Sequence, residues 1–185
     1  MRIVAGRFKG KALAAPAGAS TRPTSDRLRE TIFNVLAHGH DRVLTDTRVL
    51  DLFAGTGALG LEALSRGARA AVFIEEASGA RAVIRRNVET LGLTGATKIF
   101  RRDATRLGPC GTMTPFDLVF LDPPYRMGLG ERALASAIAG GWLALGAIAV
   151  LEEDARAEVE LPEGVTTLDQ RTVGDSQILF LTTGD

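Results

Sequence analysis

Asp122, Pro123, Pro124 and Tyr125 are the residues whose types and spacing are best suited to chemistry. They follow the apolar run 116–121, which has the composition of a buried β-strand. Two successive prolines cannot continue a strand ladder, so the backbone is expected to leave the sheet there. A carboxylate, a rigid carbonyl group and an aromatic ring would then be displayed at the carboxyl end of a strand, where open α/β sheets bind ligands. We predict that these four residues are catalytic, with the ring stacked on a planar nitrogen heterocycle and the oxygens accepting hydrogen bonds from its exocyclic amine.

A glycine-rich turn is the second candidate site. Gly55, Gly57 and Gly60 follow the apolar segment 49–53 and satisfy the spacing G-x-G-x-x-G. Glycines at this place let a ligand approach the backbone closely, and the helix that follows offers free N–H groups. The spacing alone would allow a dinucleotide such as NAD. Asp51 argues against a dinucleotide, because a carboxylate just before the turn would repel a pyrophosphate and attract a cationic ligand such as S-adenosylmethionine.

Acidic residues also follow the next two predicted strands. Glu75 can accept hydrogen bonds from both ribose hydroxyls, and Asp103 can accept one from the adenine amino group. Together with Asp51 and Asp122, they place carboxylates at the ends of four successive strands, which is unlikely for incidental capping groups. The predicted cofactor-binding residues are Asp51, Phe53, Ala54, Gly55, Thr56, Gly57, Glu75, Asp103 and Ala104.

Alternating strands and helices would bring these residues to one edge of a sheet. Strands are predicted over 49–53, 71–75, 98–101, 117–121 and 147–151. Helices are predicted up to about residue 66 and over about 79–91 and 131–139. Residues 165–171 and 178–181, joined by Gly174 and Asp175, are expected to form a terminal antiparallel pair. This order indicates an α/β fold with a doubly wound, mostly parallel, seven-stranded sheet.

The amino end is predicted to be a small extension of this fold. Residues 2–8 and 11–14 flank Gly10 and suggest a short β-hairpin. Thr24 or Ser25 can cap a following helix, whose buried face would consist of Leu28, Ile32, Val35 and Leu36. We therefore predict a hairpin extension over 1–20 and a catalytic domain over 21–185.

Composition narrows the class of protein. The chain has 185 residues, of which 45% are hydrophobic, and this is enough for one well-packed domain. With the single cysteine Cys110, no intramolecular disulfide is possible. The only histidines, His38 and His40, make a poor metal site with one distant cysteine, so no metal is predicted. No signal peptide or membrane span is recognisable, and a cytoplasmic location is expected.

The charges are distributed unevenly along a chain whose net charge is zero. Residues 1–30 contain seven basic and two acidic side chains, whereas residues 131–185 contain three basic and ten acidic ones. A basic end suggests that a polyanion docks at one face, although a solvated charged surface is an equally simple reading. The residues predicted to contact the phosphate groups of such a polyanion, RNA or DNA, are Arg7, Lys9, Lys11, Arg22 and Arg27. The acidic carboxyl-terminal third carries no recognisable motif.

Several segments together resemble a known family. Residues 51–57 and 122–125 resemble the class I S-adenosylmethionine-dependent methyltransferases that modify exocyclic amines. Residues 2–11 (RIVAGRFKGK), 22–34 (RPTSDRLRETIFN) and 51–67 (DLFAGTGALGLEALSRG) resemble the RsmD family. The resemblance implies a Rossmann-like fold, S-adenosylmethionine as cofactor, and methylation of the N2 amine of one guanine in bacterial 16S ribosomal RNA. It also implies the small ribosomal subunit or a precursor as partner, and no metal. The oligomeric state is left open, with a monomer slightly favoured.

Three other functions remain open. Methylation of adenine N6 in DNA or RNA, or of a protein amide, uses similar strand-end turns, but no separate target-recognition domain is visible in the sequence. An NAD-linked oxidoreductase fits the glycines alone and conflicts with Asp51 and Asp122. A non-catalytic RNA-binding assembly factor with a relic cofactor fold would fail to bind S-adenosylmethionine.

Overall fold

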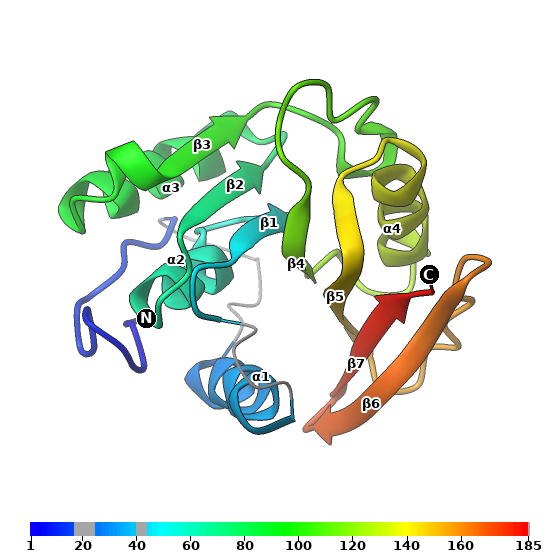
Figure 1. The fold of residues 1–185 in the computed structure, drawn as a ribbon. Helices are drawn as coiled ribbons and strands as arrows, with labels where there is room; N and C mark the ends of the chain where they lie inside the picture. The colour runs from blue at the N-terminus through cyan, green and yellow to red at the C-terminus, as the bar shows by residue number, and fades with distance from the viewer. Residues whose placement is uncertain (17–24, 40–43, 185) are drawn as a thin grey trace.

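The computed structural model describes residues 1–16, 25–39 and 44–184. Within these ranges the chain forms one seven-stranded sheet and four α-helices (Figure 1). The strands are β1 (Arg48–Leu52), β2 (Ala70–Ile74), β3 (Thr97–Phe100), β4 (Phe116–Leu121), β5 (Leu143–Asp154), β6 (Val165–Val173) and β7 (Ser176–Thr183). The helices are α1 (Asp26–Gly39), α2 (Ala58–Ser65), α3 (Ser78–Thr90) and α4 (Leu129–Ala139), and short 3₁₀ turns span Thr94–Ala96 and Ala104–Arg106.

The sheet confirms the predicted doubly wound, mostly parallel architecture. Its strand order is β3-β2-β1-β4-β5-β7-β6, with β1 to β5 parallel. Strand β7 runs antiparallel to both β5 and β6, which confirms the terminal antiparallel pair. Because β7 enters between β5 and β6, the last strand of the chain is interior and β6 forms the edge, an arrangement that the sequence pattern did not predict.

Successive residues of the central strands point to opposite faces of the sheet, and each face has its own apolar core. Val49, Phe73 and Phe120 pack with α1, α2 and α3, whereas Leu50 and Val119 pack with α4. Helices therefore lie on both sides of the sheet, as Figure 1 shows. The continuous apolar runs of β1, β2 and β4 follow from this, because both faces of these strands are covered.

The amino-terminal arm, residues 1–16, folds back on itself but does not form the predicted pair of strands. Its two limbs share a single antiparallel bridge between Arg2 and Ala12. Gly6 and Gly10 both have a φ of 83°, so the chain turns twice within five residues and the strands cannot extend. Arg7 and Lys9 therefore lie in turns and not on strands.

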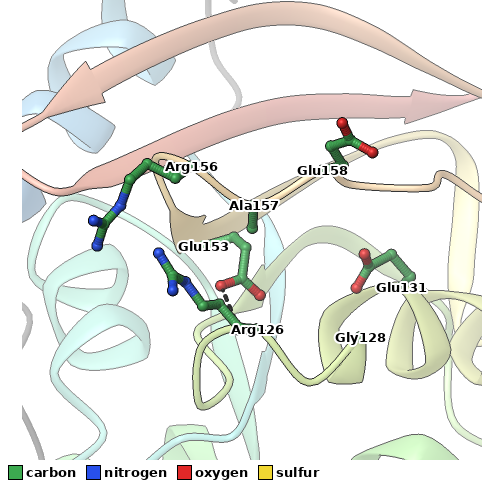
Figure 2. Close-up of a pocket in the computed structure, with 7 residues that line it drawn as sticks. All are labelled: Arg126, Gly128, Glu131, Glu153, Arg156, Ala157 and Glu158. Carbon is green, nitrogen blue, oxygen red and sulfur yellow. Dashed lines mark hydrogen bonds between the residues drawn. The ribbon is translucent and has the colours of Figure 1, made fainter.

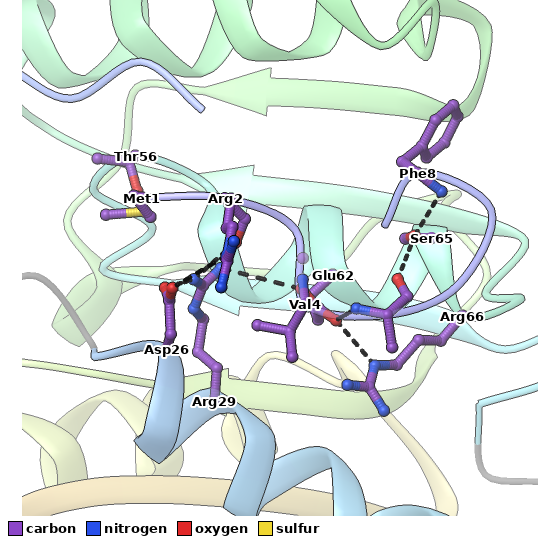
Figure 3. Close-up of polar contacts among 12 residues, drawn as sticks. Met1, Arg2, Val4, Phe8, Asp26, Arg29, Thr56, Glu62, Ser65 and Arg66 are labelled. Carbon is purple, nitrogen blue, oxygen red and sulfur yellow. Dashed lines mark hydrogen bonds and ion pairs between the residues drawn. The ribbon is translucent and has the colours of Figure 1, made fainter. Parts of the chain in front are cut away.

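Helix α2 anchors this arm through two side chains (Figure 3). The Glu62 carboxylate accepts the backbone N–H groups of Val4 and Ala5 at 2.8 and 2.9 Å. Ser65 Oγ accepts the N–H of Phe8 at 3.0 Å and donates to the carbonyl oxygen of Ala5 at 2.6 Å. The arm is thus held by side chains of the helix that follows the glycine turn, since it lacks a strand ladder of its own.

Helix α1 joins the same network. Ser25 Oγ accepts the N–H of Leu28 at 3.1 Å, which confirms Ser25 as the cap, whereas Thr24 lies outside the described residues. Leu28, Ile32 and Leu36 are buried as predicted, and Val35 is half-buried. Arg29 is completely buried, donates to the carbonyl oxygen of Arg2 at 2.8 Å and pairs with Asp26. This arginine therefore belongs to the interior of the protein and is unavailable to solvent.

Candidate functional site

The glycine turn connects β1 to α2 at the carboxyl edge of the sheet. Phe53, Gly55 and Gly57 have φ values of 59°, 57° and 78°, so the turn contains three left-handed residues. A Cβ atom at Gly57 would lie 3.3 Å from the side chains of both Phe73 and Ile84, which leaves little room for a larger residue. The backbone N–H groups at the start of α2 follow at once, as a ligand-binding turn requires.

Glu75 ties this turn to the end of β2. One of its carboxylate oxygens accepts the N–H of Gly55 at 2.9 Å, and the other accepts the N–H of Ala77 at 2.9 Å. Each carboxylate oxygen has a further lone pair, so Glu75 can still accept hydrogen bonds from ribose hydroxyls. Its predicted role in binding the cofactor remains a prediction, but its role in shaping the glycine turn is visible.

Asp51 does not reach the surface of the site. Its side chain is buried, and Oδ2 accepts the N–H of Gly60 at 3.0 Å. Burial raises the pKa of Asp51 to about 8, the Gly60 hydrogen bond opposes this rise, and the charge of Glu75 adds to it. Asp51 therefore supports the turn from inside the protein. It can affect a cationic ligand only through the negative charge that it carries when it is ionised.

Asp103 lies beyond the end of β3, with the backbone after it forming a short 3₁₀ turn. Its Oδ1 accepts hydrogen bonds from the hydroxyl and the N–H of Thr105, at 2.7 and 2.8 Å. These two hydrogen bonds lower the pKa of Asp103, which keeps the carboxylate ionised and able to accept. Ala104, the other residue predicted here, is buried.

Asn87 on α3 contacts the glycine turn and was missed by sequence reasoning. Its side-chain amide donates to the carbonyl oxygens of Thr56 and Ala14, at 3.0 and 3.1 Å, and accepts the N–H of Ala14 at 2.7 Å. Met1 approaches the same turn, with its sulfur 3.6 Å from the hydroxyl of Thr56 (Figure 3). The amino-terminal arm therefore contacts the predicted cofactor site directly.

The Asp-Pro-Pro-Tyr turn begins where β4 ends, on the strand next to β1. Asp122 and Tyr125 are half-buried, Pro123 is buried and Pro124 is exposed. The Tyr125 hydroxyl donates to the carboxylate of Glu152 and lies 2.7 Å from the hydroxyl of Ser176. Burial, followed by the Glu152 hydrogen bond, raises the pKa of Tyr125 well above its ordinary value. The ring predicted to stack on a base is therefore held at its hydroxyl end.

Two more carboxylates of β5 hold the next residue of the turn, Arg126. The backbone N–H of Arg126 donates to Glu153 at 2.9 Å (Figure 2). The guanidinium of Arg126 pairs with Asp154 at 3.1 Å. A hydrogen bond from the backbone N–H of Arg156 and another from the Arg126 guanidinium lower the pKa of Asp154 to about 2. A cavity of about 430 Å³ opens beside this contact, with Arg126 and Arg156 on one side and Glu131 on the other.

The acids of β5 and Ser176 were missed by sequence reasoning. A usable signal was present, because Glu152, Glu153 and Asp154 follow the predicted strand 147–151 just as Asp122 follows β4. The hydroxyl of Ser176 gave no signal, since it reaches the site only because β7 pairs with β5.

The predicted RNA-contacting residues are only partly described. Arg7, Lys9, Lys11 and Arg27 are all exposed, whereas Arg22 lies outside the described residues. A 3.8 Å ion pair between Arg2 and Asp26 places the first turn of α1 beside the arm. The basic residues of these two segments can therefore share one surface, and their contacts with RNA remain predictions.

Two further findings concern the part of the chain that the structure describes. Within it, no group of three histidine, cysteine, aspartate or glutamate side chains is arranged to hold a metal ion. None of its helices is both long and apolar enough to cross a bilayer.

Comparison with known proteins identifies a matching family and several related proteins. The family model described as conserved hypothetical protein 95 matches residues 1–182. The ribosomal RNA small subunit methyltransferase D of Escherichia coli strain K12 is 40% identical over 154 residues, covering 83% of this chain and 75% of that protein. Its namesake in Haemophilus influenzae is 34% identical over 176 residues, covering 94% of this chain and 89% of that protein.

Solved structures show the same fold. The yhhF protein of Escherichia coli has a TM-score of 0.84 and 34% identity, with 100% of this chain and 98% of that chain covered. TrmN of Thermus thermophilus shares the fold alone, with a TM-score of 0.68 and 21% identity over 84% of this chain and 48% of that chain. The fold is that of a class I methyltransferase, and the family match covers nearly the whole sequence. The chain therefore belongs to the RsmD family of methyltransferases.

Proposed function

We propose that the protein transfers a methyl group from S-adenosylmethionine to the exocyclic N2 amine of one guanine in bacterial 16S ribosomal RNA. The observation that carries this proposal is the adjacency of two turns, the glycine turn after β1 and the Asp-Pro-Pro-Tyr turn after β4, on neighbouring parallel strands. The names of the relatives in Escherichia coli and Haemophilus influenzae support ribosomal RNA of the small subunit as substrate.

The residues at the first turn fit this cofactor. Gly55 and Gly57 give the close backbone approach, and Glu75 and Asp103 are acceptors for the ribose hydroxyls and the adenine amine. S-adenosylmethionine supplies an activated methyl group on a positively charged sulfur. No phosphate has to be accommodated, which suits the acidic character of Glu75 and Asp103.

At the second turn, the chain has to make a poor nucleophile reactive. The lone pair of guanine N2 is delocalised into the ring. Hydrogen bonds from its two N–H groups to the Asp122 carboxylate and the Pro123 carbonyl oxygen would favour a pyramidal nitrogen with an available lone pair. Tyr125 would stack on the base and fix its orientation. Asp122 need not be a strong base, because the methylated ammonium is acidic and loses its proton easily.

The RNA has to present an unstacked base. The target guanine would lie in a loop or be flipped out of a helix, because the catalytic turn cannot reach an amine inside a duplex. Arg7, Lys9, Lys11 and Arg27, which are exposed, and Arg22 are the proposed phosphate contacts. The partner would be the small ribosomal subunit or a precursor of it, and the work would take place in the cytoplasm.

The test is transfer of labelled methyl to small ribosomal subunits purified from cells that lack the gene, followed by digestion of the RNA. Label in N2-methylguanosine is expected. Label in a methyladenosine would contradict the guanine assignment and favour the adenine-N6 alternative. Absence of label despite tight cofactor binding would overturn this substrate and direct the search to DNA and protein.

A further inference from the structure

We propose that Glu152, Glu153 and Asp154, at the end of β5, are positioning residues that hold the Asp-Pro-Pro-Tyr turn in the geometry for methyl transfer. The inference rests on the proposed function of that turn. It gives a role to part of the acidic carboxyl-terminal third, for which no motif was recognisable. These carboxylates act through Tyr125 and Arg126, and none of them is required to touch the RNA.

The first contact fixes the Tyr125 ring. Glu152 is 5% exposed and Ser176 is 2% exposed, so the phenol hydroxyl ends in an enclosed polar site. Glu152 Oε1 accepts from the Tyr125 hydroxyl, and the Ser176 hydroxyl donates to the same oxygen at 3.2 Å. Because the ring is tethered at its far end, its plane and position are set by β5 and β7 as well as by the prolines.

The second contact fixes the backbone after the ring. Glu153 Oε1 accepts hydrogen bonds from the backbone N–H groups of Arg126 and Asp154, at 2.9 and 2.7 Å. The Arg126 guanidinium bonds to both oxygens of Asp154, at 3.1 and 3.2 Å. Arg126 has a φ of 60°, a conformation that a non-glycine residue keeps only when its surroundings hold it there.

The contacts made by Glu152 and Glu153 lie on opposite faces of the sheet. Leu151 packs in the core beside α4, so the strand alternation sends Glu152 toward the α1 and α2 face and Glu153 back toward α4. Figure 2 shows Glu153 facing Arg126 on the α4 side. Glu152 and Glu153, which are consecutive residues of β5, therefore hold the turn from opposite faces of the sheet.

Stability alone does not account for this arrangement. Burying three consecutive carboxylates is unfavourable, and apolar residues would serve a purely structural strand end at least as well. One oxygen of Glu152 is buried without a hydrogen-bond partner among the described residues, which adds to the cost. The gain is a preorganised turn, and small displacements of a catalytic group have large effects on rate.

The test uses the fact that Tyr125 is the only tyrosine of the chain. Its phenol ionisation can be followed by ultraviolet absorbance without any assumption about substrate. In the wild type the pKa should lie well above the ordinary value of about 10. Glu152→Ala should lower it toward that value, whereas the exposed Glu160→Ala should leave it unchanged. An unshifted pKa in Glu152→Ala would overturn the tether, whether or not the protein methylates guanine.

Activity then tests what the tether does. Tyr125→Phe and Glu152→Ala should each lower kcat by about tenfold or more, with the KM for the cofactor within about twofold. The double variant should be no slower than the slower single variant, because both remove the same contact. Ser176→Ala replaces Glu152→Ala if the latter fails to fold. Wild-type values of kcat in Tyr125→Phe, or additive losses, would contradict the inference, whereas an inactive wild type would contradict the proposed function.

Discussion

The carboxylate of Glu75 accepts the backbone N–H of Gly55 at 2.9 Å and thereby joins the end of β2 to the glycine turn after β1. The two residues are twenty positions apart in the sequence, and each belongs to the predicted cofactor site. The acid is thus positioned by the turn, and the turn is shaped by the acid. A loss of the contact would affect both.

Removing this carboxylate should weaken cofactor binding. Glu75→Ala leaves the Gly55 N–H without its partner and deletes the proposed ribose acceptor, and hydrogen bonds to charged groups contribute about 1.5–3 kcal/mol each. The Kd for S-adenosylmethionine, measured by calorimetry, should rise at least about tenfold. The neighbouring Glu76→Ala is the matched control, since Glu76 is exposed. Equal Kd values for the two variants would show that Glu75 does not contribute to binding of S-adenosylmethionine.

The buried Asp51 should make stability depend on pH. Its pKa is about 8 in the folded protein and 3.8 in the reference state, so the folded state retains a proton that the unfolded state releases. Stability should therefore fall as the pH rises from about 4 to about 8. Asp51→Asn keeps an acceptor for the Gly60 N–H and cannot ionise.

Thermal unfolding at several pH values tests this sign. Asp51→Asn should unfold at a higher temperature than the wild type at pH 8 and show little advantage at pH 4. The difference in free energy at pH 8 should reach a few kcal/mol, since one pKa unit corresponds to about 1.4 kcal/mol. Parallel pH profiles for the two proteins would show that Asp51 has an ordinary pKa.

Gly6 and Gly10 provide a matched pair of substitutions in the amino-terminal arm. Both have a φ of 83°, so alanine at either position is strained by about 1–3 kcal/mol. At Gly6 a Cβ atom would also overlap the carbonyl oxygen of Ser65, whereas at Gly10 it would meet nothing within 4 Å. Gly6→Ala should therefore destabilise the protein clearly more than Gly10→Ala in denaturant unfolding. Equal losses would mean that the arm does not dock on α2.

A structural feature can be predicted from the sequence when neighbouring residues cause it. It cannot be predicted in this way when it depends on contacts between segments that are far apart in the chain. The strands that carry the site were predictable, because long apolar runs are closed by local signals such as Pro123 and Gly55. The insertion of β7 between β5 and β6 was not, since it depends on pairing between distant segments. Arginine and glutamate side chains are ordinarily exposed, yet Arg29 and Glu62 are completely buried and lie 3.9 Å apart across two helices.

The exposed lysines of the arm should contribute to RNA affinity. Lys9→Ala combined with Lys11→Ala removes two positive charges without touching the docking contacts of Glu62 and Ser65. Affinity for small ribosomal subunits should fall, and the slope of log K against log salt should decrease in magnitude by about one to two. Lys98→Ala combined with Arg85→Ala, at exposed positions of β3 and α3, removes the same number of charges and controls for net charge. An unchanged affinity would remove the arm from the RNA interface.

The central claim, that the turn after β4 is the catalytic centre, is tested most directly at Asp122. Asp122→Asn keeps the size of the side chain but removes its negative charge and replaces one carboxylate oxygen by an NH2 group, which cannot accept the amine N–H. Single-turnover methyl transfer to small subunits should slow by about a hundredfold or more, while the Kd for S-adenosylmethionine stays within about twofold. A single-turnover rate close to that of the wild type would show that methyl transfer does not depend on this carboxylate.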